Sequence, residues 1–358
     1  MTRALPPCRR TSRWAHLAWI LLILTLTGPV AALGADHPPD YALIPIRNMR
    51  PYNMLFLQMQ PEPPDVLSLH HSRVRIQLDI ANNLLAPLGS QGSFVEEDNE
   101  VQALRFTGAL GAGHNWELAA GIALLWRNGG MLDPILSFWH RLFGIPADGE
   151  DVPLGRTHYG DFHSVLILRD PAGRVLVNAG NAFGIGDLFV SIKRALRSPS
   201  SWWNGAVRIL AKLPTGNPGL LLGSGHPDFG VAADLRVNFT PSVVLLLNGG
   251  YVFTGGAPSG LTHRSTIPQY VVAIRYQANR RDAFLWQWDG SPPGILTGNR
   301  FADHPQATAT FGYRRTLHPG VILYASFSEN GDIHNYSLPW FSEIGPDFTV
   351  SAGVEFQH

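Results

Sequence analysis

Apolar and polar residues alternate along this chain from about residue 68 almost to its end. In residues 72–80, SRVRIQLDI, every second residue from Val74 to Ile80 is apolar, and the residues between them are polar or charged. The same period of two recurs in residues 186–197, 202–213 and 228–239. Successive side chains of a β-strand point to opposite faces, so this period predicts strands with one apolar and one polar face.

Turn signals such as DPAG (170–173) and HPG (318–320) separate the alternating segments. The pattern predicts an all-β protein, a transmembrane antiparallel up-and-down β-barrel of 12–14 strands, with 14 as the preferred count. If the pair 158–169 and 174–180 is a hairpin outside the membrane, the count is 12. The predicted spans are 72–84, 101–111, 116–127, 158–169, 174–180, 186–197, 202–213, 228–239, 242–253, 268–278, 283–289, 306–316, 320–328 and 346–356.

Short and long connections follow one another between these segments, which is typical of bacterial outer-membrane barrels with short periplasmic turns and longer outer loops. An even strand number places both termini in the periplasm. A soluble sheet also produces alternating strands, so the alternation alone does not say which face meets water.

The aromatic residues favour the membrane barrel. Trp116 and Trp126 lie ten residues apart on one face, as do Phe229 and Phe239. Ten residues at ~3.3 Å each, tilted by about 40°, span ~25 Å, the height of an outward apolar band. We expect an interfacial aromatic girdle of Trp116, Trp126, Phe229, Phe239, Tyr270, Trp286, Phe348 and Phe356.

The first 35 residues predict a secretory signal peptide. Arginines precede the apolar run WAHLAWILLILTLTG (14–28), and small residues follow it, so we expect cleavage near 32–35. Residues 36–67 are Pro-rich and not periodic, and predict a periplasmic lead-in or a plug that enters the lumen. Residues 68–358 are the predicted barrel.

One long connection has a helical period. Apolar residues between Leu132 and Phe143 recur at helical spacing in MLDPILSFWHRLFGIP (131–146), and Pro134 suits a first turn. We expect a short amphipathic helix in this outer loop, which lies over or inside the barrel mouth, rests in the lipid headgroup region, or only packs the loop.

Composition excludes several classes of function. Lys plus Arg equals Asp plus Glu, at 27 each, which argues against a nucleic-acid partner. Cys8, the one cysteine, lies in the predicted signal peptide, so zinc–thiolate sites and cysteine nucleophiles are excluded from the mature chain. The histidines show no ligand spacing and no cofactor fingerprint is present, so we expect no metal, no cofactor and no enzyme.

A lipid hydrolase or acyltransferase is a less favoured alternative. His71–Ser72 and His163–Ser164 are adjacent pairs, but neighbours on a strand point to opposite faces, so neither pair forms a working dyad by itself. A dyad assembled from different strands stays open.

The charged residues of the polar phase are the best functional candidates. They have two interpretations: a salt-bridged, closed interior, or a pore lining that attracts anions. Networks of ion pairs would favour the first, and unpaired arginines the second. The lumen-lining candidates are Arg73, Arg75, Asp79, Arg105, Glu117, Arg208, Lys212, Asp234, Arg236, Arg275 and Arg314, with Asp187, Asp289 and Glu355 as further acidic members.

Several motifs resemble a bacterial family known as domain of unknown function 3187. They are IPIRNMRPYNMLFLQ, LDPILSFWHRLFGIP, FHSV…FGIGDLFVS, RILAKLPTGN, GSGHPDFG, LWQWDG and FSEN…GPDFTVSAGVEF, and together they cover roughly residues 44–356. These Gly- and Pro-rich turn motifs specify a fold more than a chemistry. The resemblance implies an outer-membrane location and brings no known substrate or catalytic residue.

The expected function is an outer-membrane channel or uptake porin for a small hydrophobic or anionic molecule. The alternative is a closed structural or envelope-interaction barrel. Expected partners are outer-membrane lipid and lipopolysaccharide, the barrel-assembly machinery during insertion, and a small solute.

Overall fold

A computed structural model describes residues 42–90, 93–130, 164–170, 172–196, 202–298, 303–330 and 348–358. The predicted signal peptide and the predicted helix near 132–143 lie outside these residues. The barrel strands are β1 (Ser72–Ser90), β2 (Ser93–Gly113), β3 (Trp116–Asn128), β7 (Leu188–Ala195), β8 (Trp203–Leu213), β9 (Asp228–Asn238), β10 (Val243–Thr254), β12 (Thr266–Gln277), β13 (Asp282–Ser291), β15 (Gln306–His318), β16 (Val321–Asn330) and β17 (Phe348–Gln357).

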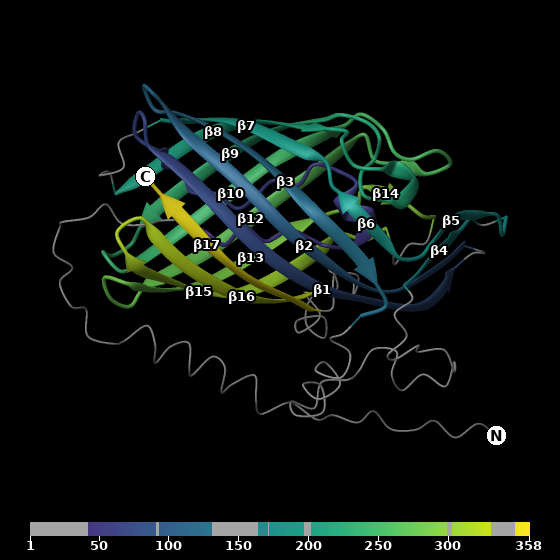
Figure 1. The fold of residues 1–358 in the computed structure, drawn as a ribbon. Helices are drawn as coiled ribbons and strands as arrows, with labels where there is room; N and C mark the ends of the chain where they lie inside the picture. Colours follow the sequence, from purple (N-terminus) through teal and green to yellow (C-terminus); the bar gives the residue numbers. More distant parts are fainter. Residues whose placement is uncertain are drawn as a thin grey trace, which may run out of the picture. The chain divides into compact units, whose positions relative to one another are not determined.

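Each of these strands pairs antiparallel with its neighbours, and β17 pairs with β1, so the sheet closes (Figure 1). Closure leaves no unpaired edge in the wall, which a lipid-exposed sheet requires. The result confirms the predicted antiparallel barrel of 12–14 strands and places the count at 12 instead of the preferred 14.

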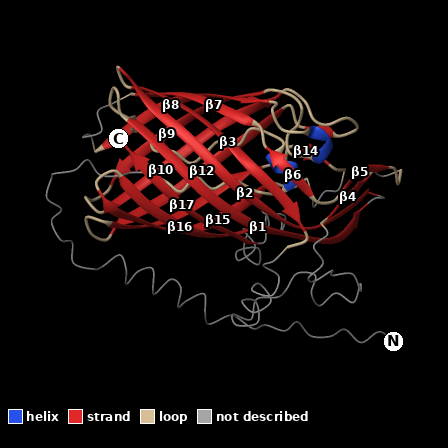
Figure 2. Ribbon diagram, viewed as in Figure 1, coloured by secondary structure: helices blue, strands red, loops and turns tan. Residues whose placement is uncertain are grey.

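The predicted hairpin of residues 158–169 and 174–180, which the preferred count of 14 included, is not part of the closed wall. Strands β4 (Val165–Arg169) and β5 (Val175–Ala179) pair with each other, and β4 joins β2 along Phe94–Asp98. This part of β2 extends past the closed wall, so β4 and β5 project from one end of the barrel (Figure 2). Residues 85–90 and 93–100, which lie in a predicted connection between strands, instead continue the β1–β2 ladder.

Short additional elements lie in the long connections. Strand β6 (Ala182–Ile185) pairs with the end of β3, and β11 (Thr262–His263) pairs with β14 (Ile295–Leu296). The helical elements are α2 (Pro51–Met54) and the 3₁₀ turn η1 (Pro218–Leu220). Within the described part of the chain, no helix is long and apolar enough to cross a bilayer.

The two faces of the wall differ in burial. On β3, Leu118 is 44% exposed, whereas its neighbour Glu117 is 3% exposed. On β1, Val74 and Leu78 are exposed, and Arg75 and Asp79 are buried. The apolar phase therefore faces outward and the polar phase faces the interior, the reverse of a soluble sheet and the arrangement of a membrane barrel.

The tight turn between β2 and β3 shows how the wall reverses direction. Gly113 pairs with Trp116, and the two residues between them, His114 and Asn115, have φ values of 48° and 66°. Positive φ at both central residues is the mark of a type I′ turn, whose twist matches that of the adjoining strands. This end of the barrel also carries the start of β1 and the end of β17.

Residues 42–67 run through the interior of the barrel (Figure 1). Ile44 contacts residues at mid-height of the wall, and α2 reaches the end that carries the long connections. The chain then returns past Glu62 and Asp65 to the start of β1. The segment forms a re-entrant loop, and the buried apolar clusters lie between it and the wall.

Candidate functional site

The interior of the barrel concentrates charged side chains from many strands. Arg105 of the lumen-lining candidates is half-buried. The other ten are buried: Arg73, Arg75, Asp79, Glu117, Arg208, Lys212, Asp234, Arg236, Arg275 and Arg314. Strand alternation explains this gathering, because every strand turns one phase toward the same axis.

Several of these charges pair within the wall. Arg75 Nε lies 2.7 Å from Glu355 Oε2, and Arg105 Nε lies 2.6 Å from Asp79 Oδ2. Arg314 Nη2 reaches Glu355 at 3.5 Å. Each pair connects two different strands, and Arg75–Glu355 joins β1 to β17, so they are part of the network that the closed-interior interpretation predicted.

Glu62 of the interior segment is at the centre of a second network. Its carboxylate lies 3.4 Å from Arg73 Nη2, 3.3 Å from Arg75 Nη1 and 3.5 Å from Lys193 Nζ. Glu117 also binds Arg73 and Lys193, at 3.2 and 3.1 Å. Burial alone would raise the pKa of the Glu62 carboxyl, but Arg73, Lys193 and Arg75 outweigh it and hold the pKa below its usual value.

The wall also binds the backbone of the interior segment through side-chain amides. Gln287 accepts a hydrogen bond from Ile44 N at 2.8 Å and donates one to Ile44 O at 3.0 Å. Asn248 bonds the N–H and the C=O of Glu62 in the same way, at 3.1 and 2.8 Å. An extended segment with no strand partner must satisfy its backbone elsewhere, and these carboxamides do so.

Cations of the wall bind further carbonyls and one carboxylate of the segment. Lys212 Nζ donates to Leu55 O at 2.7 Å, and Arg208 Nη1 donates to Gln60 O at 3.0 Å. Arg236 Nε lies 3.4 Å from Asp65 Oδ2. Lys212 also binds Asp187 at 2.6 Å, so it links the segment to the connection before β7.

The far end of the interior loop, around α2, is held by polar contacts and apolar packing. Arg50 forms an ion pair with Glu97 on the extension of β2. The side-chain amides of Asn48 and Asn53 both donate to Gln306 at the start of β15. The apolar side chains nearby form one buried cluster that includes Tyr52, Phe56, Leu57, Val95, Leu166 and Ile295.

Glycines of the inner face leave room for this segment. A Cβ placed on Gly312 would overlap Ile44, and one placed on Gly250 would overlap Met59 and the neighbouring strand. The wall thus matches the shape of the segment as well as its hydrogen-bonding groups. One cavity between the segment and the wall has a volume of about 50 Å³, room for only a few water molecules.

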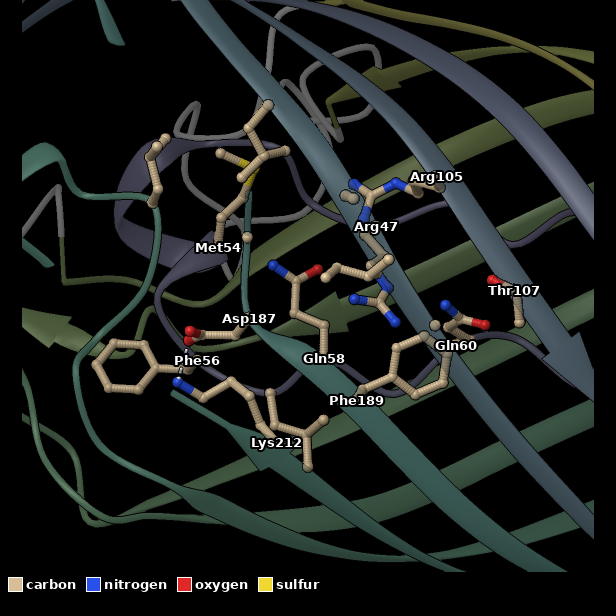
Figure 3. Close-up of a pocket in the computed structure, with 17 residues that line it drawn as sticks. Arg47, Met54, Phe56, Gln58, Gln60, Arg105, Thr107, Asp187, Phe189 and Lys212 are labelled. Atoms are coloured by element: carbon tan, nitrogen blue, oxygen red, sulfur yellow. Dashed lines mark hydrogen bonds and ion pairs between the residues drawn. The ribbon is translucent and has the colours of Figure 1, made fainter. Parts of the chain in front are cut away.

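This cavity is lined by the interior segment and the wall together (Figure 3). Arg47, Gln58 and Gln60 come from the segment, and Arg105 and Phe189 come from strands β2 and β7. The guanidinium carbon of Arg47 lies 4.8 Å from the centre of the Phe189 ring, a cation–π distance.

Sequence reasoning missed the residues of the segment that bind the wall: Arg47, Arg50, Glu62 and Asp65. Residues 36–67 have no period, so no face could be assigned to their charges. One signal was available, because isolated charges in an otherwise apolar and Pro-rich segment need partners if that segment is buried. Lys193 was also absent from the candidates, although it is on the polar phase of β7.

Most members of the expected aromatic girdle lie on the outer face near an end of the barrel. Trp116, Phe239 and Phe356 lie at the end with the short turns, and Trp126, Phe229, Tyr270 and Phe348 lie toward the other end. Phe348 is buried, and its ring centre lies 4.7 Å from that of Phe327. Trp286 lies at mid-height, between Ile274 and Phe311, and not at a rim.

The two serines that suggested hydrolase chemistry lie at opposite ends of the barrel. Ser72 begins β1 at the short-turn end, whereas Ser164 precedes β4 at the far end, where its N–H donates to Asn181. They cannot belong to one site. Among the described residues, no group of three His, Cys, Asp or Glu side chains is placed to hold a metal ion.

Comparison with solved structures finds outer-membrane barrels. The COG4313 outer membrane channel from Pseudomonas putida F1 is 11% identical, with a TM-score of 0.55, over 84% of this chain and all of that one. The Ralstonia pickettii toluene transporter TbuX is 11% identical, with a TM-score of 0.39, over 87% of this chain and 94% of that one. At such identities the first likeness establishes the fold alone.

A search with the sequence found no match among proteins with curated descriptions. The sequence profile of one family, described as protein of unknown function (DUF3187), matches residues 19–357, nearly the whole chain. The motifs quoted above, from the interior segment to β17, lie within this match. The chain therefore belongs to the DUF3187 family, in which it combines a closed β-barrel with an N-terminal segment that fills the lumen.

Proposed function

We propose that this protein is a channel of the bacterial outer membrane and that residues 42–67 are a plug that closes it. The observation that carries the proposal is the way in which the lumen is filled. A wall of 12 strands encloses more space than its own side chains occupy, and a separate segment takes up that space through noncovalent contacts. Such a plug can move without breaking the barrel.

The path of residues 42–67 through the lumen supports this function. It is attached to β1 at the end with the short turns and bends back near α2. If that end is periplasmic, as in other outer-membrane barrels, the plug can swing into the periplasm about residues 68–71. When the plug leaves, the lumen loses the carboxylates of Glu62 and Asp65, which form ion pairs with cations of the wall. The remaining lumen then has an excess of positive charge, so we expect a preference for small anionic solutes.

Planar-bilayer recordings test the channel. Full-length protein should show low conductance with rare openings, and a variant lacking residues 42–60 should conduct steadily. Both samples must first show the heat-sensitive gel mobility of a folded barrel. If the folded deletion variant conducts no ions, the channel proposal fails.

A closed structural barrel is the second candidate, and the ion pairs within the wall favour it. Pairs such as Arg75–Glu355 and Arg208–Asp234 would keep the interior closed without any plug. Solute uptake by a deletion strain separates the two candidates. An uptake defect that the full-length gene restores supports the channel, and normal uptake of all small anions tested supports the structural barrel.

The same proposal includes export and membrane insertion. We infer that residues 1–35 are a cleaved signal peptide, that the barrel-assembly machinery inserts the chain, and that the exposed apolar face contacts outer-membrane lipid and lipopolysaccharide. Membrane fractionation and the intact mass of the purified protein test this. The mature chain should begin near residues 33–36, and a mass that retains residues 1–30 would contradict the prediction.

A further inference from the structure

The cavity between the plug and the wall contains a cation whose charge is not balanced. Arg47 lines it, and two of its nitrogens, Nε and Nη2, are buried without a hydrogen-bond partner among the described residues. The cation–π contact with Phe189 is its one strong interaction shown by the structure. Arg47 is half-buried, and these two inaccessible donors favour a partner that enters the cavity.

The acidic side chains near the cavity, Asp79 and Asp187, already bind other hydrogen-bond donors. Asp79 accepts hydrogen bonds from Arg105, Gln77 and Ser351, at 2.6, 2.5 and 2.6 Å. Asp79 therefore balances Arg105 and not Arg47.

The carboxylate of Asp187 is likewise bound by other donors. It binds Lys212 Nζ at 2.6 Å and Gly216 N at 2.8 Å. With Arg105 and Lys212 each paired, the residues that line this cavity have one positive charge left over, that of Arg47.

The surroundings of Arg47 also disfavour its positive charge. Burial and the neighbouring Arg105 lower the pKa of Arg47 to about 9, against a smaller opposite effect of Asp79. The side chain is still protonated at neutral pH. Its environment therefore favours any species that brings a negative charge into the cavity.

We propose that this cavity binds a small carboxylate anion through Arg47. Nε and Nη2 lie on the same edge of a guanidinium, and a planar carboxylate accepts two parallel hydrogen bonds from that edge. The side chain of Gln60 also lines the cavity (Figure 3) and provides an amide donor, whereas the amide of Gln58 donates to Asn48 O and Asn53 O.

The size of the cavity limits the ligand. A volume of about 50 Å³ admits roughly three or four water-sized groups, which suits formate or acetate and excludes a sugar acid. The site exists only while the plug is in place, since Arg47 belongs to the plug and Phe189 to the wall. A bound carboxylate therefore stabilises the closed state by mass action.

Thermal unfolding of the full-length protein in detergent tests the site, with sodium acetate as the probe in chloride-free buffer. Acetate should raise the unfolding temperature in a saturable way, and gluconate at the same ionic strength should not. Arg47→Gln should weaken the apparent acetate affinity at least about tenfold, because it removes a charge-assisted pair of hydrogen bonds. Arg47→Lys, which keeps the charge, should bind with intermediate affinity.

Arg174→Gln is the matched control, because this arginine side chain is 78% exposed and lies outside the lumen. It should respond to acetate as the wild type does. An equal acetate response in Arg47→Gln, or equal stabilisation by gluconate, overturns the proposal. The assay measures no ion flux, so its result is independent of whether the barrel conducts. Should Arg47→Gln fail to fold, loss of the response in Arg47→Lys relative to Arg174→Gln decides the question.

Discussion

At the scale of single residues, alternation determines which side chains meet lipid. On β3, Ile122 is near the middle of the strand on the outward phase, whereas Ala123 is buried on the inward phase. This assignment was predictable from sequence, because the period of two needs no knowledge of the partner strands. Alternation alone did not give the direction of each phase, since a soluble sheet would bury the apolar one, and the spacing of the aromatic residues was needed to predict that it faces outward.

Ile122→Arg should lower the free energy of unfolding by ~2–4 kcal/mol, because it places a cation at mid-depth in the membrane. Leu118→Arg, nearer Trp116 at the rim, should cost less. Urea titration of the protein refolded into lipid vesicles measures both. A negligible effect of Ile122→Arg would mean that this face does not contact lipid.

Glu62→Gln should destabilise the closed plug, by less than the ~3–5 kcal/mol that an uncompensated buried charge costs, because the three cations bound to Glu62 keep Glu117 or Glu355. The frequency of channel openings in planar bilayers should rise. Asp282→Asn is the control, since it removes an ion pair with the exposed Arg315. A pair in solvent contributes little, so the openings should stay rare. Equal opening in the two variants would argue against Glu62 as the anchor of the plug.

At the scale of elements, most strand boundaries followed from the turn signals, to within a few residues. Strands β8 and β9 begin and end within one residue of their predicted spans. The main errors lie at the end with the long connections. Here β1 and β2 continue beyond the barrel and β4 pairs with β2, because hydrogen bonding along an exposed edge does not depend on an apolar period.

Linking the plug to the wall near α2 should keep the channel closed. Asn53 donates to Gln306, so N53C and Q306C can be joined by a short thiol crosslinker. Cys8 lies in the predicted signal peptide, and no other cysteine competes. The joined variant should lose the rare openings, and a reducible crosslinker should restore them after reduction. Openings that persist after complete crosslinking would show that ions bypass the plug.

At the scale of the whole molecule, closure of the lumen depends on the ionisation of the Glu62 carboxyl in the plug. The pKa of Glu62 is held below its usual value of about 4.3, so its contribution to stability is complete above that pH and is lost as the pH falls through the lowered value. We expect no increase in openings between pH 7 and about pH 5, and opening only under stronger acid. Glu62→Gln should lack this acid step. Opening of the wild type between pH 7 and 5 would contradict the prediction.

The sequence by itself determined the alternation, the turns and therefore the strands of the barrel, because those properties depend on neighbours one to four residues apart. It also identified the charges of the inner phase, such as Arg75 and Glu117. Only the tertiary structure decided that residues 42–67 return through the lumen and that Glu62 and Arg47 lie against the wall. Contacts between the plug and the wall join residues up to 258 positions apart, and a segment without a period carries no local sign of its partners.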